Sequence, residues 1–213
     1  FEPVEAVRAL AETAVRRGAR LLERSPVERL DDLAADAVVV AAGGWLPRLV
    51  PPPPETRVTL QHELFFRPRA DDAPPMPPWS FDIATSGFYG FPPLADGRHK
   101  VALHRLGPPL DDPERKPAPA DEEVREVAAF VTERFPWLDA SRPTWRSCQY
   151  TTAGDGSFVF APVADRERLY VAGCGGGHAF KFGPLLGEWA ADLVEGKEIP
   201  DDLKGHAGPD RVV

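Results

Sequence analysis

The sequence has few cysteines and no long apolar run. Only two of its 213 residues are cysteines, Cys148 and Cys174, which is too few for a disulfide scaffold, so we expect a reducing, cytoplasmic setting. No apolar stretch approaches the roughly 18 residues that cross a bilayer, and no signal peptide is recognisable. We therefore expect no membrane partner.

Positive charge is also scarce. The 25 lysines and arginines are outnumbered by 33 acidic residues, the formal net charge is −8, and no basic run stands out. Nucleic acids and anionic membrane surfaces are therefore not expected as partners, because both attract basic proteins.

Proline, in contrast, is abundant. Proline accounts for 25 residues and is concentrated in Pro51–Pro54, Pro74–Pro78 and Pro92–Pro117, which predicts loops, turns or sheet edges there. The chain also opens at Phe1 without an initiator Met, directly before a helical pattern. We expect it to be the later part of a longer polypeptide.

The first 50 residues have a mixed helix and strand texture. Apolar residues at helical spacing follow Pro3, and Gly18 marks the end of that helix. Short strands are expected at residues 19–22, 26–30 and 37–42. The last of these contains three consecutive valines, a pattern typical of a strand buried in a parallel sheet.

The middle of the chain changes to alternating segments. Residues 58–66, 81–91 and 100–106 predict antiparallel strands joined by proline-rich loops. Residues 121–134 predict a helix, with Asp121 able to cap it. After Pro143 the α/β texture returns, so the fold class is α/β (α+β), with a mainly antiparallel insertion.

Residues 173–183 read GCGGGHAFKFG, a glycine loop between a strand and a helix. A phosphate-binding P-loop is excluded because Phe182 follows Lys181, and the dinucleotide motif G-x-G-x-x-G fails because its sixth residue is His178. A metal site with Cys174 and His178 offers only two ligands. A tight turn with incidental polar side chains stays open.

Five stretches together resemble one family. They are this loop with its helix, the turn AAGGW at residues 41–45, GFYGFP at 87–92, Lys100-x-x-x-His104, and CQYT at 148–151. Their order and spacing are similar to those of monomeric sarcosine oxidase and N-methyl amino-acid oxidases, in the D-amino-acid-oxidase-like group of FAD-dependent oxidoreductases.

The resemblance implies an incomplete FAD-binding domain made of residues 1–50 and 146–213, with a substrate domain at 51–145 inserted between them. It implies FAD, attached covalently through Cys148, and no metal. The activity implied is oxidation of a secondary amine or N-alkyl amino acid to an imine, with O2 reduced to hydrogen peroxide, by a monomer or homodimer.

The resemblance also assigns residue roles. Lys100 would promote the reaction with O2, and His104 would shape the amine site. Tyr89, His104 and Lys181 would bind substrate. The residues expected beside the flavin are Gly43, Trp45, Cys148, Tyr150, Gly175, Gly176, Gly177, His178 and Lys181. Bare main chain at the glycines would let a planar ring approach.

The sequence departs from the family in one large respect. The N-terminal dinucleotide motif, an acidic residue for the ribose and an arginine-bearing loop are missing from these 213 residues. Three alternatives therefore stay open: an amine dehydrogenase that passes electrons to a carrier, a non-catalytic flavin-binding or subunit-interface piece, and a substrate-domain fragment that folds only with a partner.

Overall fold

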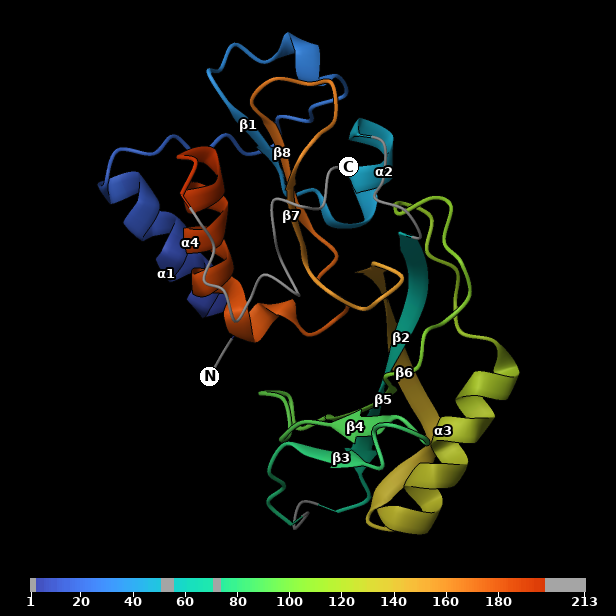
Figure 1. The fold of residues 1–213 in the computed structure, drawn as a ribbon. Coiled ribbons are helices and arrows are strands. Elements are labelled where there is room, and N and C mark those ends of the chain that lie inside the picture. The colour runs from blue at the N-terminus through green and yellow to red at the C-terminus, as the bar shows by residue number, and fades with distance from the viewer. Residues whose placement is uncertain (1–2, 51–55, 71–73, 198–213) are drawn as a thin grey trace. The chain divides into compact units, whose positions relative to one another are not determined.

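The computed structural model describes residues 3–50, 56–70 and 74–197 (Figure 1). The chain divides into two compact units, Phe1–Ala35 and Asp36–Val213. Each unit is described by itself below.

The first unit contains one long helix. Helix α1 (Pro3–Arg16) begins at the proline predicted to start it, and Gly18 just beyond its end has a φ of +101°. The short helix η1 (Leu30–Asp32) follows. The strands predicted at 19–22 and 26–30 are wrong: both segments are exposed and irregular, apart from the first residue of η1 at Leu30. A strand needs a hydrogen-bonded neighbour, and the described part of this unit supplies none.

The second unit holds two sheets, of which the smaller has three strands. Its strands are β1 (Val38–Val40), β7 (Val159–Pro162) and β8 (Leu169–Gly173), in the order β1-β8-β7. Strand β1 pairs with β8 in parallel, which confirms the prediction from the valine run. Strand β7 pairs with β8 antiparallel.

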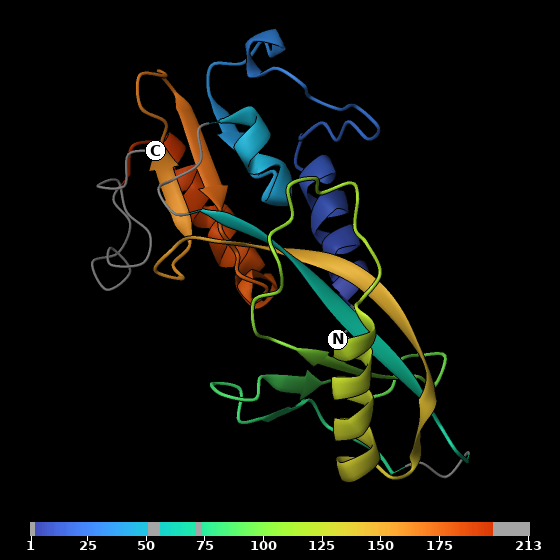
Figure 2. The same cartoon turned by 90° about the vertical axis from the view of Figure 1, so that its right-hand side faces the viewer.

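The larger sheet is antiparallel throughout, as predicted, in the order β3-β4-β5-β2-β6. The five strands are β2 (Arg57–Pro68), β3 (Trp79–Phe81), β4 (Phe88–Gly90), β5 (His99–Leu103) and β6 (Leu138–Thr152). The two longest, β2 and β6, are neighbours that run side by side in Figures 1 and 2.

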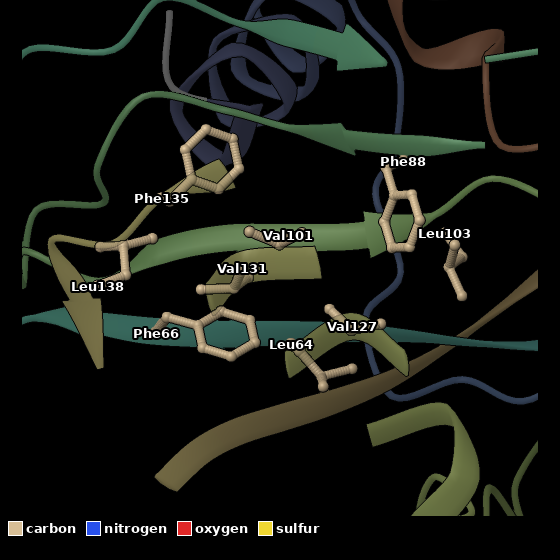
Figure 3. Close-up of a cluster of buried hydrophobic side chains, with 9 residues drawn as sticks. All are labelled: Leu64, Phe66, Phe88, Val101, Leu103, Val127, Val131, Phe135 and Leu138. Atoms are coloured by element: carbon tan, nitrogen blue, oxygen red, sulfur yellow. The ribbon is translucent and has the colours of Figure 1, made fainter. Parts of the chain in front are cut away.

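One face of the larger sheet packs against helix α3 (Asp121–Arg134), which has the predicted bounds. Val127 and Val131 of α3 lie in one buried cluster with side chains of four strands (Figure 3). The strand side chains of this core are Leu64, Phe66, Val101, Leu103, Phe88 and Leu138. The predicted cap is wrong: the cap position is Ala120 and no side chain caps the helix. Asp121 is instead the first helical residue, where its charge still suits the positive helix end.

The remaining short elements lie next to the strand ends. They are η2 (Gly43–Trp45) and α2 (Leu46–Leu49) after β1, and η3 (Ala179–Phe182) and α4 (Gly183–Val194) after β8. Gly196 follows α4 with a φ of +69°, as expected of a residue that ends a helix. Trp189 and Leu193 of α4 pack on Phe160 of β7. The predicted domain boundary at residue 146 falls inside β6, and the domain division stays a prediction.

Candidate active site

The face of the larger sheet opposite α3 carries a row of polar and aromatic side chains. Strand register sets this row, because directly paired residues of antiparallel strands share a face. Tyr89 of β4 pairs with Ala102 of β5, Ala102 pairs with Glu63 of β2, and Glu63 pairs with Arg146 of β6. Residues two positions along, Lys100 and Cys148, extend the same face.

Lys100 and Glu63 form a buried ion pair on this face. Their side chains are 12% and 10% exposed. The ammonium also lies 4.9 Å from the ring centroids of Tyr89 and Phe91, a cation–π arrangement. The second carboxylate oxygen of Glu63 accepts a hydrogen bond from Arg146 Nε at 2.7 Å. The charge of Lys100 is therefore held within an aromatic and ionic surrounding.

The pKa of Glu63 lies below its ordinary value of 4.5. Burial acts to raise this pKa, but the charge and hydrogen bond of Lys100, followed by those of Arg146, outweigh the burial. Glu63 is thus ionised at neutral pH, and both of its oxygens are bonded to cations.

Tyr89, Tyr150 and His104 meet at the end of this row. The Tyr150 hydroxyl donates to Tyr89, and burial raises the pKa of both phenols. His104 follows β5 and places Nδ1 3.4 Å from the Tyr150 hydroxyl. Burial lowers the pKa of His104, and the nearby charges of His178 and Lys181 lower it further. His104 is therefore neutral at pH 7.

The glycine loop joins this cluster through β6. The Gly176 N–H donates to the Thr151 carbonyl at 3.0 Å, which fastens the loop beside Tyr150. Gly176 and Gly177 have φ values of +54° and +76°, which favour glycine. A Cβ on Gly177 would stand 2.2 Å from the Tyr150 ring. The need for glycine at Gly177 thus follows from Tyr150 and backbone geometry, a reason that the sequence alone did not suggest.

His178 and Lys181 extend from the same loop. His178 is half-buried, its Nδ1 donates to the Gly176 carbonyl at 3.1 Å, and its ring lies 5.2 Å from that of Phe158. Lys181 is exposed, and its ammonium lies 5.2 Å from the Phe182 ring centroid. The contacts of this loop with Thr151 and Tyr150 join it to the sheet row.

Cys148 is a free, half-buried cysteine on the sheet row. Burial raises the pKa of its thiol, and the negative charge of Glu63 raises it further. The thiol is therefore protonated at neutral pH in this state of the protein.

Two predicted residues lie apart from the cluster. Gly43 and Trp45 are in η2, where the Trp45 indole N–H lies 3.4 Å from a Glu114 carboxylate oxygen and Lys116 lies over the ring. The turn reaches β6 instead through Gly44, which packs against Gln149. No contact of the described residues brings Trp45 to Lys100 or Tyr150.

Glu63 and Arg146 belong to the cluster but were missed from the sequence. Glu63 sits in QHELFF, where a single carboxylate after two polar residues and before an apolar run gives a weak signal. The alternation of side chains along a strand could have indicated it. An acidic residue that alternation places on a buried strand face needs a cationic partner.

Two cavities of the second unit lie outside the cluster. The larger, about 650 Å³, lies between the η2–α2 turn and the start of β2, and the smaller, about 310 Å³, lies beside α3. Lys100 and Lys181 line neither cavity. Among the described residues, no group of three or more His, Cys, Asp or Glu side chains could hold a metal ion. No helix in the described ranges has the length and apolar character of a membrane span.

The cluster gathers donors suited to an electron-rich planar group that becomes anionic on reduction. The Lys100 ammonium, two phenols and the neutral His104 imidazole lie together, the charge of Lys181 acts on His104, and a free thiol lies on the same sheet face. Apart from this cluster, beside Gly44 of the η2 turn, the buried amide oxygen of Gln149 has no hydrogen-bond partner among the described residues. A bound group with an N–H or O–H donor would satisfy it. These features fit a flavin cofactor.

A sequence profile of the FAD dependent oxidoreductase (DAO) family matches residues 1–193, and the chain belongs to that family. The sarcosine-oxidase-like resemblance is confirmed by two N-methyl-L-tryptophan oxidases. The Citrobacter koseri protein is 30% identical over 190 residues, covering 83% of this chain and 48% of that protein. The Yersinia pestis protein is 28% identical over 218 residues, covering 93% and 57%.

Solved structures support the fold. A glycine oxidase from Geobacillus kaustophilus superposes with a TM-score of 0.62 at 21% identity, covering 84% of this chain and 46% of that one. An Amadoriase I mutant from Aspergillus fumigatus gives 0.75 at 19% identity, covering 92% and 52%. The chain thus spans about half the length of the proteins that it matches.

Proposed function

We propose that the protein oxidises a secondary amine or N-alkyl amino acid to an imine, with O2 reduced to hydrogen peroxide. The observation that carries the proposal is the convergence of Lys100, Tyr89, Tyr150 and His104 with the loop bearing Lys181. Family membership and the similarity to N-methyl-L-tryptophan oxidases support it.

FAD, when bound, would accept a hydride equivalent, which is two electrons and one proton, from the carbon next to nitrogen. In the proposal Gly175–Gly177, His178 and Tyr150 face the cofactor, and Cys148 is the covalent attachment point. Gly43 and Trp45 would contact its dinucleotide part. The half-buried thiol lies on the same sheet face as Lys100, which suits this role.

The chain's own residues would bind and orient the substrate. The exposed ammonium of Lys181 is available for a carboxylate. His104 is neutral, so it can accept a hydrogen bond from the substrate nitrogen. Tyr89 would form part of the wall of this site. Holding the reacting carbon in one orientation is the protein's main contribution.

Lys100 would act on dioxygen. One-electron transfer to O2 produces superoxide, and a fixed positive charge of low exposure stabilises that anion. The full-length protein, purified with its flavin, tests this: mixing the dithionite-reduced protein with air-saturated buffer should give rapid reoxidation, slowed at least about tenfold in Lys100→Met. Fast reoxidation in that variant would contradict the role of Lys100.

A second measurement tests the cofactor and its linkage. Acid precipitation should leave a yellow pellet, and the intact mass should exceed that of the polypeptide by one FAD. A Cys148→Ala variant should release its flavin into the supernatant. A colourless pellet from the unaltered protein, with Cys148 as a free thiol, would contradict covalent attachment.

One observation favours a second candidate, an amine dehydrogenase of the same superfamily that uses a carrier acceptor. The Glu63 carboxylate bonds directly to Lys100 and offsets its positive charge. Reoxidation by air that is slow, and unaffected by Lys100→Met, would support the dehydrogenase.

A further inference from the structure

Lys100 carries its charge on a flexible four-carbon stem, so its position needs an anchor. In the structure the anchor is Glu63, on the neighbouring strand β2. Both side chains are close to fully buried. A buried ammonium without a counter-charge would lose much of its solvation free energy.

Glu63 is itself held from two sides. One oxygen accepts from the Lys100 ammonium and the other from Arg146 Nε at 2.7 Å. The carboxylate therefore has no free oxygen with which to turn toward another partner. Because β2 lies between β5 and β6, backbone pairing fixes Glu63 on both sides as well.

Arg146 completes the cluster from the solvent side. Its side chain is 69% exposed, and its guanidinium lies 5.8 Å from the Phe65 ring centroid. Glu63 thus connects an inner cation with an outer one, and the three groups together carry one net positive charge. Arg146 restores the positive charge that Glu63 would otherwise cancel.

We propose that Glu63 is a positioning residue, which fixes the charged ammonium of Lys100 at the rings of Tyr89 and Phe91, and that Arg146 in turn holds the Glu63 carboxylate. The proposal rests on the proposed function, because it assigns Lys100 the reaction with dioxygen. Glu63 touches neither substrate nor dioxygen in this scheme and acts only through Lys100.

The first test needs no cofactor chemistry. Brief acetylation with acetic anhydride labels only uncharged, accessible amines, and peptide mass spectrometry measures the fraction of Lys100 that reacts. Glu63→Gln and Glu63→Ala should increase Lys100 acetylation at least about fivefold, because the ammonium loses the carboxylate that fixes it. Glu63→Asp should restore partial protection.

Two further variants complete this test. Arg146→Ala, at an exposed side chain that is expected to tolerate substitution, should give a smaller rise of about twofold. Glu126 lies on α3, at the opposite face of the sheet, and pairs with Arg105. Glu126→Gln breaks that pair and should leave the acetylation of Lys100 unchanged. Equal Lys100 labelling in the unaltered protein, Glu63→Gln and Arg146→Ala would overturn the proposal. If Glu63→Gln does not fold, Glu63→Asp and Arg146→Ala decide.

The second test measures air reoxidation of the dithionite-reduced flavin in the full-length protein. If the Lys100→Met variant reoxidises slowly, the reoxidation rate of Glu63→Gln should be at least about tenfold lower than that of the unaltered protein. The rate of Glu63→Asp should lie between the two. A Glu63→Gln rate equal to or above that of the unaltered protein would overturn positioning. If Lys100→Met reoxidises at the unaltered rate, the oxidase proposal fails instead, and the acetylation result still decides whether Glu63 anchors Lys100.

Discussion

The two faces of the five-stranded sheet differ in what holds them together. The face toward α3 is mainly apolar, with most of its members in one buried cluster, and it also carries the pair of the buried His62 with Glu123 of α3. The opposite face carries Lys100, Glu63, Arg146, Cys148 and Tyr89, whose contacts are ion pairs and hydrogen bonds. Strand alternation places both sets on the same strands, so one face can supply stability while the other holds polar groups that are costly to bury.

The largest effect is expected on the apolar face. Phe66→Ala removes a fully buried ring between β2 and α3. The lost burial and the cavity that remains should lower the free energy of unfolding by about 3–5 kcal/mol. Urea denaturation followed by circular dichroism measures it. A loss below about 1 kcal/mol would contradict the assignment of this cluster as the core.

A somewhat smaller effect is expected on the polar face. Glu63→Gln leaves Lys100 buried without its counter-charge and should cost about 3 kcal/mol at pH 7. The folded pKa of Glu63 lies below 4.5, so the stabilisation is present above that pH and is lost as the pH falls through the folded value.

The difference in unfolding free energy between the unaltered protein and Glu63→Gln should therefore shrink below pH 4.5. Denaturation at pH 7 and at several lower pH values measures this trend. A difference that stays constant over that range would show that the substitution acts through packing and not through charge.

The contrast between the faces also separates what the sequence could predict from what it could not. The bounds of α3 and the parallel pairing of β1 follow from local apolar patterns, which depend on neighbouring residues. The Glu63–Lys100 and Glu63–Arg146 contacts join residues 37 and 83 positions apart. They depend on strand register, which a bulge between Phe65 and Arg67 also alters, so no local pattern specifies them.

Other differences have local causes. The strands expected at 19–22 and 26–30 had suitable residues but no strand to pair with in the described part of their unit. At Gly177 the sequence correctly indicated close approach, but the approaching group in the structure is the Tyr150 ring. A pattern thus identifies a backbone requirement more readily than the partner that imposes it.

A third prediction concerns the loop that joins the polar face. Gly177→Ala would place a Cβ 2.2 Å from Tyr150 at a φ of +76°, and this overlap and strain should cost about 2 kcal/mol. Gly187→Ala in α4 is the matched control. Nothing lies within 4 Å of its Cβ, so helix propensity should stabilise the protein by about 0.5–1 kcal/mol. Thermal denaturation distinguishes them, and a neutral Gly177→Ala would contradict the contact with Tyr150.

The smallest effect is expected for an exposed ion pair on the α3 side. Arg105 and Glu126 form two hydrogen bonds, the same kind of contact as in the Glu63 cluster, but their side chains are 55% and 36% exposed. Water solvates both ions before and after folding, so Glu126→Gln should change the free energy of unfolding by less than about 1 kcal/mol. Salt should reduce even that difference, because exposed charges are screened within a Debye length. Denaturation of both proteins at low and high salt measures this. A cost equal to that of Glu63→Gln would mean that burial is not what distinguishes the two carboxylates, and the comparison of the two faces would then fail.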